Sequence, residues 1–134
     1  MKRNADITVQ SRETTYRAGG VIEQLADGVR ITYQEPKELK MGTVTTTLTV
    51  RGGVAALSRT GAVRCALRFE EGKLHRSVYE TYYGTFPTEL RTHTLRAKMD
   101  GSGGLLDLHY TLAVGGAPDE HRLKILVRAK EEMK

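Results

Sequence analysis

Apolar side chains recur at every second position along most of the chain, which is the period of a strand with one buried face. The pattern is clearest in residues 59–84, where alternate positions are apolar at Val63, Cys65, Leu67 and Phe69. A short polar stretch with a glycine, residues 70–73, follows before the alternation resumes. The segment therefore predicts two antiparallel strands joined by a tight turn.

The first half of the chain follows the same pattern with interruptions. Residues 29–33 alternate cleanly and predict a strand, which Pro36 ends before an expected loop. Residues 43–50, TVTTTLTV, are rich in β-branched side chains that favour sheets. We expect a break at 18–20, Ala-Gly-Gly, and residues 21–25 have the propensity for one helical turn.

The second half predicts long strands. Residues 106–114 and 123–127 carry clean apolar stripes, and a slip in spacing between Leu90 and Leu95 indicates a β-bulge. The pattern amounts to roughly ten short strands with turn signals about every 8–12 residues, and no segment has sustained helical periodicity. An open meander of this length would leave exposed edges, so we predict one domain, residues 1–134: an all-β, closed antiparallel barrel of roughly 8–10 strands.

Composition excludes several classes of protein. The 134 residues are 39% hydrophobic with no Trp, and the longest apolar runs are too short for a membrane span. The N-terminus has basic residues but no apolar stretch behind them, which argues against a secretory signal. The single cysteine, Cys65, excludes an internal disulfide framework, so we expect a cytoplasmic protein.

Several short motifs resemble one family, the YwiB-like proteins of bacteria, which have no assigned function. They are RTGAV (59–63), FEEGK (69–73) and YETYYG (79–84), with ITYQE (31–35) and GTVTTTLTV (42–50) before them. The resemblance covers residues 19–128 and implies a calycin-type, lipocalin-like barrel. It implies no activity, cofactor or ligand. The chain departs from the family before Gly19, where the first hairpin is shorter, and this leaves open whether the barrel is sealed there.

Charged residues fall within the alternation of two predicted strands. Arg59 shares a strand face with Leu57, and Arg76 and Glu80 share theirs with Val78. If the apolar residues point inward, so do these charges, and a buried charge requires a partner. We therefore predict an Arg59–Glu80 ion pair at one barrel end.

Two readings of that cluster remain open. In the first, it anchors a small anionic ligand, with the candidate ligand-binding residues Arg59, Glu80, Tyr33, Arg76 and Thr46. In the second, the same side chains are a structural plug that closes the barrel, since barrels of this size are either filled or hold one small ligand.

Catalysis is the weakest hypothesis. The chain has no nucleophile elbow, phosphate loop or dinucleotide fingerprint, and its four histidines share no metal-ligand spacing, so we expect no catalytic residues, metal or cofactor. Cys65 lies on an inward stripe and reads as an inert buried thiol.

A net charge of +5 leaves a second function open. Basic residues fall on the predicted outward side of several strands: Arg64, Arg68, Arg96, Lys98, Lys124 and Arg128. If those strands are neighbours, they form a positive face for a nucleic-acid or ribonucleoprotein accessory protein. Steep salt dependence would separate this function from ligand binding inside the barrel, and the sequence leaves the oligomeric state undetermined.

Overall fold

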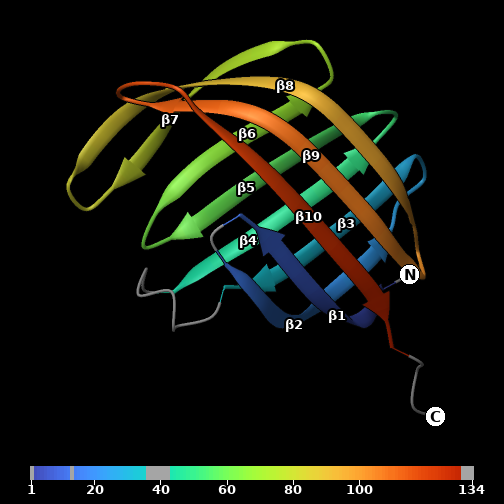
Figure 1. Cartoon of the computed structure of the whole chain (residues 1–134). Coiled ribbons are helices and arrows are strands. Elements are labelled where there is room, and N and C mark those ends of the chain that lie inside the picture. Colours follow the sequence, from blue (N-terminus) through green and yellow to red (C-terminus); the bar gives the residue numbers. More distant parts are fainter. Residues whose placement is uncertain (1, 13, 36–42, 131–134) are drawn as a thin grey trace.

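The computed structural model describes residues 2–12, 14–35 and 43–130, which form a closed antiparallel barrel (Figure 1). Its ten strands are β1 (Lys2–Ser11), β2 (Thr15–Gln24), β3 (Gly28–Gln34), β4 (Val44–Arg51), β5 (Val54–Gly61), β6 (Arg64–Glu70), β7 (Leu74–Thr81), β8 (Gly84–Asp100), β9 (Gly103–Val114) and β10 (Asp119–Ala129). The predicted closed all-β barrel is confirmed. The predicted loop at 37–42 lies outside the described residues.

The first and last strands close the sheet. β1 pairs with β10 over Ala5–Ser11 and with β2 over Lys2–Gln10, so the short N-terminal hairpin seals the cylinder. Pairing elsewhere follows chain order, from β2 through β10. The described part of the chain has no helix that is long and apolar enough to span a membrane.

Two expectations for the first half of the chain are wrong. The predicted break at 18–20 and the predicted helical turn at 21–25 both fall within or at the end of β2, which continues to Gln24. Gly20 allows this continuity, because a Cβ at that position would lie 2.4 Å from the carbonyl oxygen of Thr32 on β3. The glycine therefore permits close approach of two strands rather than ending one.

The interior is apolar over most of its length. The alternation predicted for 29–33 is confirmed, since Val29, Ile31 and Tyr33 are all buried. The register of β8 and β9 shifts between Thr92 and Thr94, which confirms the predicted bulge. The largest side chains with almost no exposed surface include Phe69, Ile7, Ile31, Leu48, Leu90, Leu106, Leu108 and Ile125.

β7 faces the opposite way from the prediction. Leu74, Val78 and Tyr82 lie on or near its outer side, with exposed fractions of 37%, 45% and 93%. The register explains this, because Cys65 points inward and stands directly opposite Tyr79, and paired residues share a face. Tyr79 and the residues at every second position from it therefore turn inward, and the other face of β7 is exposed to solvent.

Candidate functional site

Strand register gathers three of the predicted site residues on the inner wall. Tyr33 on β3 is paired with Thr46 on β4, and Thr46 is paired with Arg59 on β5. Alternation turns all three inward, and Tyr33 and Thr46 are buried. They form a row across neighbouring strands near the end of the barrel where β3 finishes and β4 begins.

Arg59 forms an ion pair with Glu35, which follows β3. Arg59 Nε and Nη2 donate to the two Glu35 carboxylate oxygens, each over 2.7 Å, and Thr46 Oγ1 donates to Glu35 Oε2 over 2.8 Å. The exposed fractions are 7% for the Glu35 side chain and 20% for that of Arg59. A bidentate, largely buried pair of this kind fixes both side chains in position.

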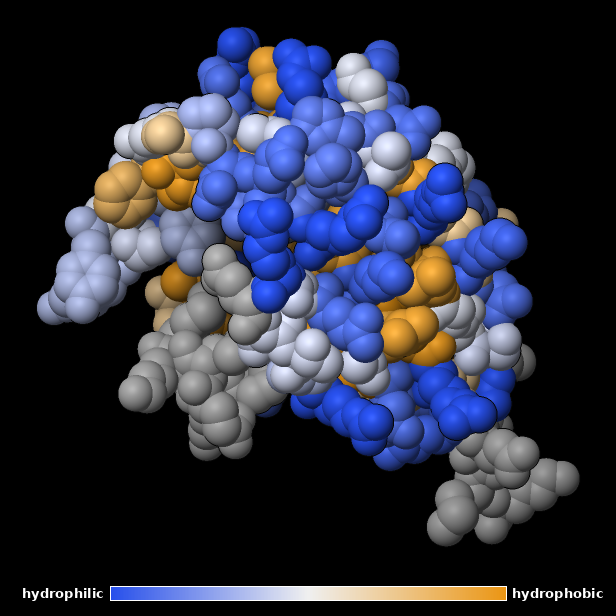
Figure 2. Space-filling view, viewed as in Figure 1, coloured by the Kyte–Doolittle hydropathy of each residue, from blue (hydrophilic) through white to orange (hydrophobic). Residues whose placement is uncertain are grey.

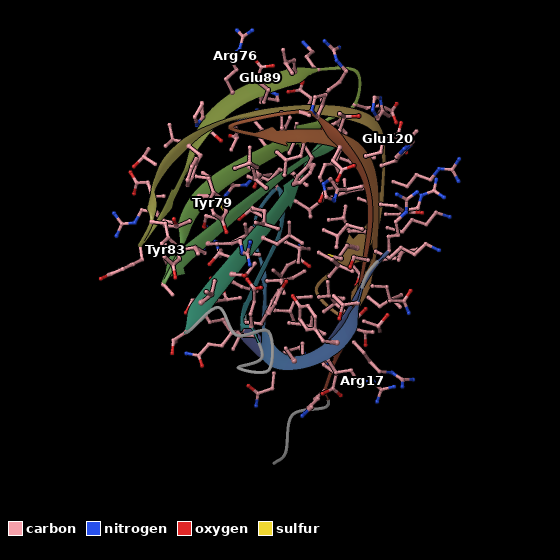
Figure 3. All side chains as sticks on the ribbon, turned by 60° about the vertical axis from the view of Figure 1, so that its left-hand side comes forward. Arg17, Arg76, Tyr79, Tyr83, Glu89 and Glu120 are labelled. Atoms are coloured by element: carbon pink, nitrogen blue, oxygen red, sulfur yellow. The ribbon has the colours of Figure 1, made fainter. Side chains whose placement is uncertain are left out.

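The predicted Arg59–Glu80 pair is therefore wrong. Glu80 lies on the exposed outer face of β7, and Arg76 on the same face forms an ion pair with Glu89 over 3.1 Å. Figure 3 shows Arg76 and Glu89 projecting away from the barrel. Neither Glu80 nor Arg76 contributes to the inner cluster, because the register inverts β7. The sequence does carry a signal for Glu35, which continues the alternation of residues 29, 31 and 33.

Glu35 keeps Arg59 charged inside the barrel. Burial alone lowers the pKa of the guanidinium, but the hydrogen bonds and negative charge of Glu35 outweigh this and raise it overall.

Cys65 on β6 is paired with Arg59 on β5, and its thiol is buried. Burial raises the pKa of Cys65, and the nearby Arg59 charge offsets only part of the effect. The cysteine therefore stays a neutral thiol, unsuited to act as a nucleophile.

Two tyrosine hydroxyls face one another beside this pair. Tyr16 on β2 and Tyr33 have their hydroxyl oxygens 3.5 Å apart, a long and weak hydrogen bond. Burial raises the pKa of both phenols, and the negative charge of Glu35 adds to this; their mutual contact raises the pKa of Tyr33 further and lowers that of Tyr16 by a smaller amount. Both stay protonated, and only one of their two hydroxyl hydrogens can lie in the shared contact. Tyr16 was not predicted, because the break expected at 18–20 interrupts the strand Thr15–Gln24 on which it stands.

These groups border a cavity of about 350 Å³ at this end of the barrel, which we call the cup. Its polar side holds Tyr16, Tyr33, Glu35, Thr46 and Arg59. Its apolar walls come from Val9, Leu57, Leu67, Phe69 and Leu123, and Tyr110, Ser11 and Thr14 complete the lining. The cup therefore combines apolar walls with one polar corner, the usual character of a small-molecule site.

Possible metal ligands and the predicted outward-facing basic residues do not gather at one place. Within the residues that the structure places, no three His, Cys, Asp or Glu side chains gather closely enough to hold a metal ion. All six basic residues predicted to face outward are exposed, as expected. However, Arg64 and Arg68 stand on β6, whereas the other four stand on β8 and β10.

Comparison with known proteins places the fold. The chain matches the family described as "Domain of unknown function (DUF1934)" over residues 2–125. A solved structure, "Crystal structure of ywiB protein from Bacillus subtilis", is similar with a TM-score of 0.85 and 21% identity, over 97% of this chain and 94% of that one. No curated protein matches. The predicted YwiB-like resemblance is thus confirmed, and the chain belongs to the DUF1934 family of domains of unknown function.

Proposed function

We propose that this protein binds a small, mainly apolar molecule in the cup, with the molecule's hydrogen-bond-accepting head group held at the polar corner. The observation that carries the proposal is the cavity of about 350 Å³, which has apolar walls and a buried polar cluster at one side. Its volume falls within the range of about 300–1,000 Å³ found for ligand sites. A barrel of ten strands is also wider than the eight-stranded barrels that hold a single ligand.

The polar corner favours acceptors over donors. Tyr16 and Tyr33 are neutral phenols, and at least one of their hydroxyl hydrogens points away from their shared contact. Arg59 supplies positive charge beside them, although Glu35 balances that charge over 2.7 Å. A carboxylate or sulfonate on the ligand would compete with Glu35 for Arg59, whereas an uncharged carbonyl would accept from the tyrosines alone. Both head groups share the property of accepting hydrogen bonds.

Two fluorescent probes test this proposal. 1-Anilinonaphthalene-8-sulfonate (ANS) and N-phenyl-1-naphthylamine have the same rings, and only ANS carries a sulfonate. We expect both to fluoresce on binding the wild-type protein, with ANS binding more tightly. In Glu35→Gln, the competing negative charge is lost, so the affinity for ANS increases while that for the uncharged probe stays the same.

A matched pair of tryptophan variants locates the probes. Leu67 lines the cup, so Leu67→Trp fills it and abolishes the fluorescence of both probes. Leu126 lies on the outer surface with 40% exposure, and Leu126→Trp leaves both signals unchanged. Near-ultraviolet circular dichroism checks that each variant keeps fixed tertiary packing, because ANS also binds partly unfolded chains. Equal binding of the probes to both tryptophan variants would contradict the proposal.

A cytoplasmic location and a calycin relationship fit such a binding protein and stay predictions from the sequence.

A further inference from the structure

Cationic side chains concentrate on one side of the outer wall. We call this side, formed by β8, β9, β10, β1 and β2, the basic face. Seven exposed cations on or beside these strands carry the argument: Arg12, Arg17, Arg96, Lys98, Arg122, Lys124 and Arg128. Lys2 and Arg91 are also exposed on these strands, and Lys130, just after β10, pairs with Asp6 over 3.4 Å. The acidic side chains nearest to them in the sheet are Asp6, Asp107 and Glu120. In Figure 2, which looks onto β10 and β1, hydrophilic residues dominate and surround small apolar patches.

Several cations on other strands have an acidic partner, although Arg64 and Lys73 have none within 4.0 Å among the described residues. On other strands and turns, Arg30 pairs with Glu23, Arg51 with Asp27 and Arg76 with Glu89, over 3.0–3.3 Å. Over residues 2–12, 14–35 and 43–130, none of the seven cations of the basic face has a carboxylate within 4.0 Å. The neighbouring carboxylates of Asp6, Asp107 and Glu120 therefore balance the seven charges only in part, and the remaining positive charge favours binding of an anion.

Register aligns the cations along β10. Arg122, Lys124 and Arg128 face outward on this strand, and they span about 20 Å at 3.4 Å per residue. Ser11 is paired with Leu123, so Arg12 at the end of β1 comes beside Arg122. Figure 3 shows nitrogen-tipped side chains gathered along this side of the barrel, between the labelled Glu120 and Arg17.

Two grooves follow this line. One, of about 470 Å³, is lined by Arg12, His109, Arg122 and Lys124 together with Glu120 and uncharged neighbours. The second, of about 550 Å³, lies farther along β10 and has Arg17 and Arg128 with Asp6 in its lining. The cations thus border a recessed track rather than a flat surface. Among the residues that the structure places in the two linings there is no Phe, Tyr or Trp.

We propose that the basic face binds a single strand of nucleic acid through its phosphates, along the track formed by β10. A groove bordered by cations follows one phosphate backbone, whereas a flat anionic membrane cannot enter it. Without Phe, Tyr or Trp in the grooves, only the imidazoles of His109 and His121 can stack on bases, so binding depends mainly on the phosphates and little on sequence. This site is separate from the cup, which lies inside the barrel.

The salt dependence of binding gives a quantitative test. Fluorescence anisotropy of a fluorescein-labelled oligothymidine is measured over a series of salt concentrations. Four contacts, from Arg12, Arg122, Lys124 and Arg128, predict a slope of log K against log salt of about −2.8, at about −0.7 for each phosphate of a single strand. Arg122→Gln/Lys124→Gln removes two contacts, so the slope falls to about −1.4 and binding at low salt weakens on the order of tenfold or more.

A control variant separates the track from overall charge. Arg64 on β6 and Lys73 in the following turn are exposed, and neither lies on the basic face. Arg64→Gln/Lys73→Gln removes the same charge and should leave both affinity and slope unchanged. Thermal unfolding confirms that each variant is folded, and Arg12→Gln/Arg128→Gln, which also removes two of the four contacts, provides a second pair if the first is not folded.

Three outcomes would overturn the proposal. Equal weakening by both double variants would mean that only net charge matters. A slope near zero would mean that phosphates are not contacted. Binding to vesicles containing phosphatidylserine, without binding to the oligonucleotide, would assign the face to a membrane instead. Binding of ANS in the cup serves as an independent readout, since the oligonucleotide should not displace it.

Discussion

Replacement of Glu35 by Gln removes the negative half of the ion pair inside the barrel. Gln has nearly the same shape, so the change is electrostatic and leaves no cavity. Arg59 keeps its charge but loses the carboxylate that binds it over two contacts of 2.7 Å. Removing one member of a buried pair costs about 3–5 kcal/mol, because the other charge loses the group that balances it in the interior.

For Glu35→Gln, the geometry of the pair predicts a loss of stability below about 3–5 kcal/mol. Arg59 is 20% exposed, so water can partly solvate its charge, and the amide oxygen of Gln still accepts one hydrogen bond. We therefore expect Glu35→Gln to lower the free energy of unfolding by about 2–3 kcal/mol. For a chain of this length, that corresponds to a decrease in melting temperature of roughly 8–12 °C.

Glu80→Gln is the matched control. It is the same chemical change on the exposed outer face of β7, so we expect an effect of at most about 0.5 kcal/mol. Urea unfolding of the wild type and both variants measures the difference. Equal stabilities of the two variants, or a larger loss in Glu80→Gln, would refute the assignment of Glu35 as the partner of Arg59.

Three further predictions concern other parts of the barrel. Burial raises the pKa of Tyr33 above its ordinary value of 10.0, so the folded state holds this proton more tightly and stability falls as pH rises above about 10. Tyr33→Phe should reduce that fall by up to about 1.4 kcal/mol per pH unit in urea titrations. Gly104→Ala should cost about 2–4 kcal/mol in urea unfolding, because φ is +144° and a Cβ would lie 1.9 Å from the Lys98 oxygen. Gly19→Ala, with nothing within 4 Å, is its control, and equal costs would contradict the argument. Cys65 should react with Ellman's reagent only in denaturant, because the thiol is buried and its pKa is raised; rapid reaction of the folded protein would disprove this.

Alternation was a reliable guide where one strand face is uniformly apolar. Ala55 and Leu57 are buried on β5, and their stripe correctly brings Arg59 to the inner wall. The same holds for Tyr33 on β3 and Thr46 on β4. In these strands one face is much more apolar than the other, so burial of that face decides which way the strand points and the alternation alone predicts it.

β7 shows where the pattern fails. Large apolar residues stand on its outer face and Tyr79 stands on its inner face, so hydrophobicity does not choose between the two orientations. The choice is made by the hairpin register, which pairs Cys65 with Tyr79. A shift of one residue in register reverses both faces, and this information lies in the turn geometry rather than in the alternation.

Glu35 was missed for a different reason. It follows the last residue of β3 and precedes Pro36, so it reads as the end of a strand rather than as part of the inner wall. Its long side chain nevertheless reaches Arg59, two strands away. The predicted requirement for a carboxylate partner was correct, and only its position along the chain was wrong.

A crystal structure of the protein with bound ANS tests most directly whether the cup is a binding site. We predict the naphthalene rings against the apolar wall formed by Leu57, Leu67 and Phe69, with the sulfonate beside Tyr33 and Arg59. A probe bound only on the outer surface, with the cup closed by side chains, would contradict this account and support the structural plug.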